Sequence, residues 1–264
     1  MSLFDRFKKA GSRPAANSTS AGPTPVGGSA PATRAEPAAY DLTEVRHTAD
    51  TVFCNGFHTF DEALAGLFDY YEGCSEPETG SLEADFEAVL RQAWQDRLAE
   101  QATWDGPGDY AKLADAFERL QAGGIVARMN FTCCQTCGHA EIGDEASRGP
   151  DQRILERGYV FFHQQDSARI ADGGELYLAF GAFTADQGTD PQLLDEARQG
   201  NDQARSKVLS QASARESLIA HETAIAHDVA AALRASGLDV EWDGDISQRI
   251  RVHITQWRMP LPAG

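Results

Sequence analysis

Apolar side chains recur at intervals of three and four residues in the first part of the chain, between Asp41 and Gln121. This spacing, without runs of β-branched residues, predicts amphipathic helices. Thr59, followed by two acidic residues, is the expected N-cap of one of them. The predicted stripes are Phe57, Phe60, Leu64, Leu67, Phe68 and Tyr71, then Leu82, Phe86, Val89, Leu90, Ala93 and Leu98, with a third helix over 110–121. Residues 40–122 are therefore predicted to form a helical segment.

The pattern changes after Gly123 and Gly124, where apolar and polar residues begin to alternate. Alternation is typical of strands, because successive side chains lie on opposite faces. Strands are predicted over 125–131, 158–164, 175–183, 238–242 and 249–257, with a helix over 214–235. Asp243-Gly244 between the last two strands indicates a hairpin. This order predicts an α+β domain over 123–259, built as a ferredoxin-like antiparallel sheet with helices on one face.

Two polar stretches interrupt this globular pattern. Residues 11–39 consist mainly of Ala, Pro, Ser, Thr and Gly, so 1–39 is predicted to be a disordered tail. The tail starts with a short basic amphipathic segment, residues 1–10, that could touch an anionic membrane surface or a partner protein. Residues 184–213 are predicted to form a polar insertion.

Charge and length restrict the class of function. The chain of 264 residues has a formal charge of −17, and residues 41–120 carry 18 acidic and 5 basic groups. An acidic surface repels phosphate backbones, which makes nucleic acid an unlikely partner. No apolar run approaches the roughly 20 residues that a membrane span needs. Without a secretory leader, the protein is expected in the cytoplasm with reduced thiols.

The densest group of reactive side chains follows the first predicted strand, where Cys133, Cys134, Cys137 and His139 fall within seven residues. Thiolate and imidazole are the ligands that zinc prefers, but a structural site needs four of them. Because the chain has no second C-x-x-C, His163 or His253 could complete the set only from a neighbouring strand. A C-x-x-C at a helix start also fits thiol redox chemistry. The simplest interpretation is three small side chains packing a strand-to-helix junction.

A second group of polar residues stands at the end of the strand 158–164. A carboxylate beside an imidazole can carry out acid–base chemistry, so His163, Asp166 and Glu141 are candidate catalytic residues. The same residues could equally form a satisfied polar cluster at the end of a sheet. The chain contains no P-loop, G-x-G-x-x-G, H-E-x-x-H or G-x-S-x-G motif that would indicate another chemistry.

Several segments together resemble an uncharacterised, mostly actinobacterial family known as domain of unknown function 6891. They are CC-x-x-CG-x-AEI at 133–142, GYVFFH-x-QD at 158–166, LYLAFGA at 176–182, and V-x-W-x-G with RI-x-V at 240–252. The resemblance covers roughly residues 40–259 and implies no activity, substrate or catalytic residues. It also implies relatives with a Gly-Tyr-Thr-x-Ser-Asp-Gly segment in place of the cysteines, so a metal site is not expected throughout the family.

Three classes of function follow from these observations. The sequence favours an interaction or regulatory module with an unknown protein partner, which would use the sheet face carrying Arg249, Arg251 and His253. The second class is a zinc-binding or thiol redox protein built on the cysteines. The third is a small hydrolase-like enzyme. A fold of this kind hosts many unrelated functions, so the site must decide between them.

Overall fold

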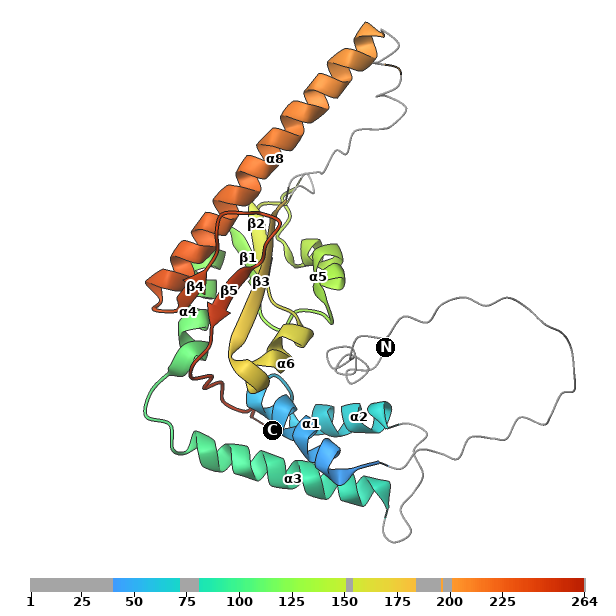
Figure 1. Ribbon diagram of the computed structural model, residues 1–264, viewed down its shortest axis with the longest axis vertical. Helices are drawn as coiled ribbons and strands as arrows, with labels where there is room; N and C mark the ends of the chain where they lie inside the picture. The colour runs from blue at the N-terminus through green and yellow to red at the C-terminus, as the bar shows by residue number, and fades with distance from the viewer. Residues whose placement is uncertain (1–39, 72–80, 151–153, 184–195, 197–200, 264) are drawn as a thin grey trace, which may run out of the picture.

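The computed structural model describes residues 40–71, 81–150, 154–183, 196 and 201–263 (Figure 1). The helices are α1 (Leu42–Asn55), α2 (Phe60–Tyr70), α3 (Leu82–Gln101), α4 (Gly108–Ala122), α5 (Gln135–Glu141), the short 3-10 helix η2 (Ile142–Glu145), α6 (Gln164–Gly173) and α8 (Asp202–Ala235). The strands are β1 (Ile125–Arg128), β2 (Gly158–Phe161), β3 (Glu175–Ala182), β4 (Asp239–Glu241) and β5 (Ile250–His253). The α+β class and the helical N-terminal segment predicted from the sequence are confirmed.

Helices α1, α2 and α3 share an apolar cluster of their own, centred on fully buried Phe53, Leu67 and Phe86. Their starts are fixed by side-chain caps, because the first amides of a helix have no partner within it. The capping box at Thr59 pairs it with Glu62 in both directions, which confirms the predicted N-cap. The three helices form a layer that lies at one end of the sheet, where α1 packs against α6 (Figure 1).

The five described strands form one sheet in the order β1-β2-β3-β5-β4. Strands β1 and β2 run parallel, and the other neighbours run antiparallel. The predicted wholly antiparallel, ferredoxin-like sheet is thus wrong in this respect. Parallel neighbours require a long crossover connection, and here α5 and η2 lie within the connection between β1 and β2.

Helices cover both faces of the sheet rather than the single face predicted. Helices α4 and α8 pack on the face that carries Ile125, Val160 and Val252. On the opposite face, Val126 and Phe161 pack with Ile142 of η2. Figure 1 shows α5 on the side of the sheet away from α4 and α8. The connection between β1 and β2 therefore supplies the cover for the second face.

The two polar stretches predicted from the sequence compare with the structure as follows. Helix α8 begins at Asp202 rather than at residue 214, so it enters the predicted polar insertion. The predicted tail, 1–39, and residues 184–195 and 197–200 of the insertion lie outside the described residues. Among the described residues, no helix combines the length and the apolar character needed to cross a membrane.

The segment 254–261 links the sheet to the helical layer. Trp257 is buried in the cluster of the sheet, and Leu261 is buried in the cluster of α1, α2 and α3. Between them, the buried guanidinium of Arg97 donates to the carbonyl oxygens of Trp257 at 3.4 Å and Met259 at 3.5 Å. The same group donates to the Cys54 carbonyl at 2.9 Å. One α3 side chain thus holds this segment against the end of α1.

Candidate metal centre

The turn between β1 and α5 is held in an unusual conformation. Asn130 and Thr132 both have positive φ, 50° and 53°, a region that costs residues other than glycine free energy. Backbone hydrogen bonds tie this turn to the end of β2, from the Phe131 amide to the Phe162 carbonyl at 2.8 Å and from the Gln164 amide to the Thr132 carbonyl at 3.1 Å. The turn is thereby held beside the end of β2, directly before the cysteines.

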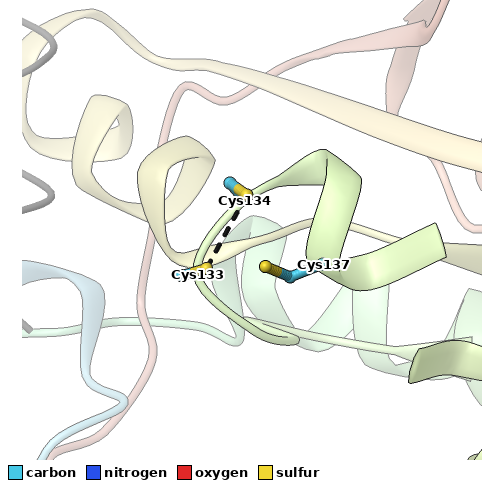
Figure 2. A group of neighbouring side chains, drawn as sticks. All are labelled: Cys133, Cys134 and Cys137. Atoms are coloured by element: carbon cyan, nitrogen blue, oxygen red, sulfur yellow. Dashed lines mark hydrogen bonds between the residues drawn. The ribbon is translucent and has the colours of Figure 1, made fainter. Parts of the chain in front are cut away.

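Three sulfur atoms converge where this turn enters α5. The Sγ atoms of Cys133, Cys134 and Cys137 all lie within 4.8 Å of one another. Figure 2 shows Cys137 pointing from the first turn of α5 toward the turn that carries the other two. Cys133 is buried, its neighbours are half-buried, and the Cys133 thiol lies 3.7 Å from the Cys134 sulfur. Thiolates around one zinc ion, each at about 2.3 Å, lie about 3.8 Å apart, so the sulfurs are close to the required spacing.

The pKa values of Cys134 and Cys137 are shifted in opposite directions. The backbone amide of Cys137, donating to the Cys134 sulfur, lowers the pKa of Cys134. Contacts with the sulfurs of Cys133 and Cys134 raise the pKa of Cys137 to about 12. Ionisation of Cys134 is therefore favoured, whereas ionisation of Cys137 beside it is disfavoured, because like charges repel at short range. A bound cation would offset this repulsion, since metal binding releases protons from its thiol ligands.

Gly138 sets the height of α5 above the sheet. A Cβ atom at this position would stand 3.1 Å from Cδ2 of Phe161 and would overlap two further carbons of that ring. Only a residue without a side chain lets the helix rest on the fully buried Phe161. The sequence showed Gly138 within a motif, but its role depends on the facing strand and was not predicted.

His139 does not join the sulfurs. Its Nδ1 atom lies 2.9 Å from the hydroxyl oxygen of Tyr159, and its Nε2 atom lies 3.4 Å from the amide nitrogen of Gln135. Its ring packs edge-on against Tyr159 and Phe161. Desolvation there, and then the nearby imidazole of His163, lower the pKa of His139. Among the described residues, the clustered ligand atoms are the three sulfurs.

His163 and Asp166 form a buried polar network at the start of α6. The His163 Nε2 atom lies 3.0 Å from Oδ2 of Asp166, whose side chain is fully buried. Arg249 of the segment entering β5 donates to both oxygens of that carboxylate, at 3.0 and 2.9 Å. Ser167 joins the network to the cysteine turn by donating to Oδ1 of Asn130 at 2.7 Å. The Nδ1 atom of His163 is buried and has no hydrogen-bond partner among the residues that the structure describes.

The third candidate for acid–base chemistry lies elsewhere. Glu141 is exposed at the last position of α5, whereas His163 is buried and precedes α6. The structure therefore brings together two of the three predicted residues, His163 and Asp166, and adds Arg249. The sequence placed Arg249 on the correct face of β5 but gave no sign of its partner, which lies 83 residues earlier.

The other cations of this sheet face are also paired. Arg251 contacts Glu175 at 3.2 Å and also pairs with Glu241, and His253 lies 3.2 Å from Glu241. Ile250, Val252 and Ile254 are buried on the opposite side, as the hairpin pattern predicted. The basic side chains on the face proposed for an interaction module thus already have acidic partners within the chain.

Together these observations define an α+β protein with a mixed five-stranded sheet and a thiol cluster at the junction of β1 and α5. The chain belongs to a family described as a domain of unknown function (DUF6891), which it matches over residues 39–200 and 208–261. The resemblance seen in the sequence is thus confirmed. The comparisons with curated proteins and with solved structures found no match.

Proposed function

We propose that this protein binds a zinc-type transition metal ion through Cys133, Cys134 and Cys137. The observation that carries the proposal is the convergence of three sulfurs within 4.8 Å. Soft thiolate ligands select zinc and copper(I) over magnesium or calcium, whose preferred ligands are oxygens. Three cysteines that only filled space would have no reason to point their sulfurs at one another.

The backbone supports the same conclusion. Asn130 and Thr132 hold left-handed conformations, each of which costs on the order of 1 kcal/mol or more. Such strain persists where surrounding contacts fix it, and it is concentrated at binding sites. In this chain the strained turn presents Cys133 and Cys134 to the first turn of α5. Metal binding by these cysteines would account for the strained conformation.

Thiol redox chemistry is the second candidate, because Cys134 and Cys137 form a C-x-x-C across the start of a helix. Their sulfurs are close enough to form a disulfide after a small movement of the turn, since a disulfide requires a sulfur separation of about 2.05 Å. The two candidates differ in the part played by Cys133. A metal site uses all three sulfurs, whereas a dithiol couple uses two.

The interaction module and the hydrolase remain predictions with less support. Pairing of Arg251 and His253 with acidic neighbours leaves little free positive charge for an acidic partner. The exposed position of Glu141 leaves His163 and Asp166 without the third predicted catalytic group. A zinc site would still be compatible with a regulatory role, which the metal would then control.

The test is elemental analysis of reduced protein produced with added zinc and purified without chelators. We expect about one zinc per chain in the wild type and almost none in the Cys134→Ser, Cys137→Ser double variant. Cys54→Ser is the matched control, because Cys54 lies in α1, outside the cluster, and should leave the zinc content unchanged. Folded wild-type protein without metal after zinc loading would refute the proposal, and thiol titration would then test the dithiol couple.

A further inference from the structure

We infer that Nδ1 of His163 is the fourth ligand of this site, which completes a closed set of three thiolates and one imidazole. This inference rests on the proposed metal function. The observation behind it is a side chain 6% exposed, whose Nε2 lies 3.0 Å from the Asp166 carboxylate and 3.4 Å from the Arg249 guanidinium, and whose buried Nδ1 has no hydrogen-bond partner among the described residues. Buried polar atoms without partners are rare and require an explanation.

The alternation of side chains along β2 places His163 beneath α5. Phe161 lies on the face covered by α5 and η2, and Phe162 lies on the face covered by α4 and α8. His163 is extended, with φ −108° and ψ 172°, so its side chain returns to the face of Phe161. Since Gly138 rests on Phe161, the next position along the strand lies below the start of α5.

The backbone brings the cysteine turn to the same place. The hydrogen bonds from Phe131 to Phe162 and from Gln164 to Thr132 flank His163 on both sides. Cys133 follows Thr132 directly. The backbone therefore carries the imidazole and the sulfurs to the same edge of the sheet, where the connections after two parallel strands leave it, the usual position of ligand sites in sheets with parallel strands. The imidazole nitrogens of His163 do not lie within 4.8 Å of all three sulfurs, so the fourth bond requires a movement of the imidazole toward them.

The partners of the imidazole prepare Nδ1 for a metal. The Asp166 carboxylate oxygen lies closer to Nε2, at 3.0 Å, than the Arg249 guanidinium, at 3.4 Å, so we place the imidazole proton on Nε2, which leaves the Nδ1 lone pair free. Histidines that bind metals typically donate their other nitrogen to a carboxylate in this way. Arg249 donates to both oxygens of Asp166, which fixes the orientation of the carboxylate.

The other histidines near the sheet are less suitable. His139 has Tyr159 at its Nδ1 atom. His253 lies on β5, two strands beyond β2 in the sheet order, or roughly 10 Å away at the usual strand spacing, and it contacts Glu241. His163 thus replaces His139 as the imidazole ligand expected from the sequence.

A site with four protein ligands has no open position for a substrate. Such closed zinc sites stabilise structure, whereas catalytic sites keep one position for water. Here the metal would join the turn after β1 to the start of α6. Through Asp166 and Arg249, metal occupancy would also be coupled to β5. The site is therefore suited to a structural or sensing role.

Cobalt(II) titration of reduced protein tests the inference, because thiolate and imidazole ligands give distinct absorption bands. We expect the wild type and His139→Ala to show the same spectrum of three sulfurs and one nitrogen. His163→Ala should keep the sulfur charge-transfer band, change the ligand-field bands, and weaken binding by more than the about 10–100-fold typical of losing an outer partner. Asp166→Asn should weaken binding by about 10–100-fold with little spectral change.

The outcomes separate the two proposals. A wild type that binds no cobalt refutes the metal function itself. Wild-type binding that is unchanged in His163→Ala, while the double cysteine variant loses it, refutes only the fourth ligand. Should His163→Ala fail to fold, cadmium-113 NMR of the wild type decides, because scalar coupling from the metal to Nδ1 of His163 is expected. Cadmium signals without coupling to any histidine would refute the inference.

Discussion

The placement of α5 on the sheet predicts an unusual result for Gly138→Ala. In most helices alanine is more favourable than glycine by about 1 kcal/mol. Here the new Cβ atom would overlap the ring of Phe161, which is fully buried. Overpacking of this kind costs up to about 3 kcal/mol. The two effects together give a net loss of about 2 kcal/mol, or about 4–8 °C in melting temperature for a chain of this size.

Gly143→Ala provides the matched control, because a Cβ atom at Gly143 in η2 would meet no atom within 4 Å. We expect the control to leave the melting temperature unchanged or slightly higher. Urea unfolding of both variants measures the free-energy difference. Moving α5 also moves Cys137, so Gly138→Ala should weaken cobalt binding as well. A Gly138→Ala protein as stable as the control would show that α5 does not rest on Phe161 as described.

Two further predictions concern the segment 254–261 and its anchors. Burial raises the pKa of Asp109, but hydrogen bonds from Lys112 and from the amides of Gln256 and Thr255 outweigh burial and lower it. The stability contributed by Asp109 is therefore full above the unfolded-state pKa of about 3.9 and is lost as the pH falls through the lower folded value. Urea unfolding at pH 7 should show that Asp109→Asn is less stable than the wild type by about 1–3 kcal/mol. Below pH 4, the variant should lose stability less steeply with falling pH than the wild type. An equally steep loss in both proteins would contradict this prediction. Arg97→Met should cost about 2–3 kcal/mol, because it removes the buried guanidinium that donates to the carbonyls of Cys54 and Trp257. Hydrogen exchange should then increase selectively in α1, and uniform exchange throughout the chain would argue against this anchoring role.

The parts of the fold that depend on local chemistry could be predicted from the sequence. The last two strands pair antiparallel as expected, with Val240 facing Val252, although residues 242–249 connect them rather than the two residues Asp243-Gly244 alone. The capping box at Thr59 needs only residues three positions apart. These features succeed because their signals are short-range and their periods are unambiguous.

The direction of β1 relative to β2 could not be predicted in the same way. Their connection contains α5, a helix of 7 residues, which is too short to show a clear helical period. A crossover cannot be expected without evidence of that helix, so an antiparallel return was the simpler expectation. The parallel pair then decides which helices cover which face.

The same distinction between short-range and long-range signals applies to the candidate site. Cys133, Cys134 and Cys137 are close in the sequence, and the structure places their sulfurs together. The pairing of Asp166 with Arg249 spans 83 residues and depends on the register of the sheet. A single sequence contains no signal for such a contact, so the role inferred for His163 required the structure.

The path of the segment 254–261 also has a consequence for how the chain acquires its structure. This segment is synthesised after the helices and strands that it joins, yet Trp257 and Leu261 complete apolar clusters on either side. Helices α1–α3 can therefore assemble early on the ribosome, but they cannot be locked to the sheet until these residues have emerged. Contacts across about 160 residues, such as Arg97 with Trp257, form slowly because long loops must close first. The final docking of the two clusters is thus expected to be a late step in biosynthesis, during which the unfinished helical layer is exposed to chaperones and proteases.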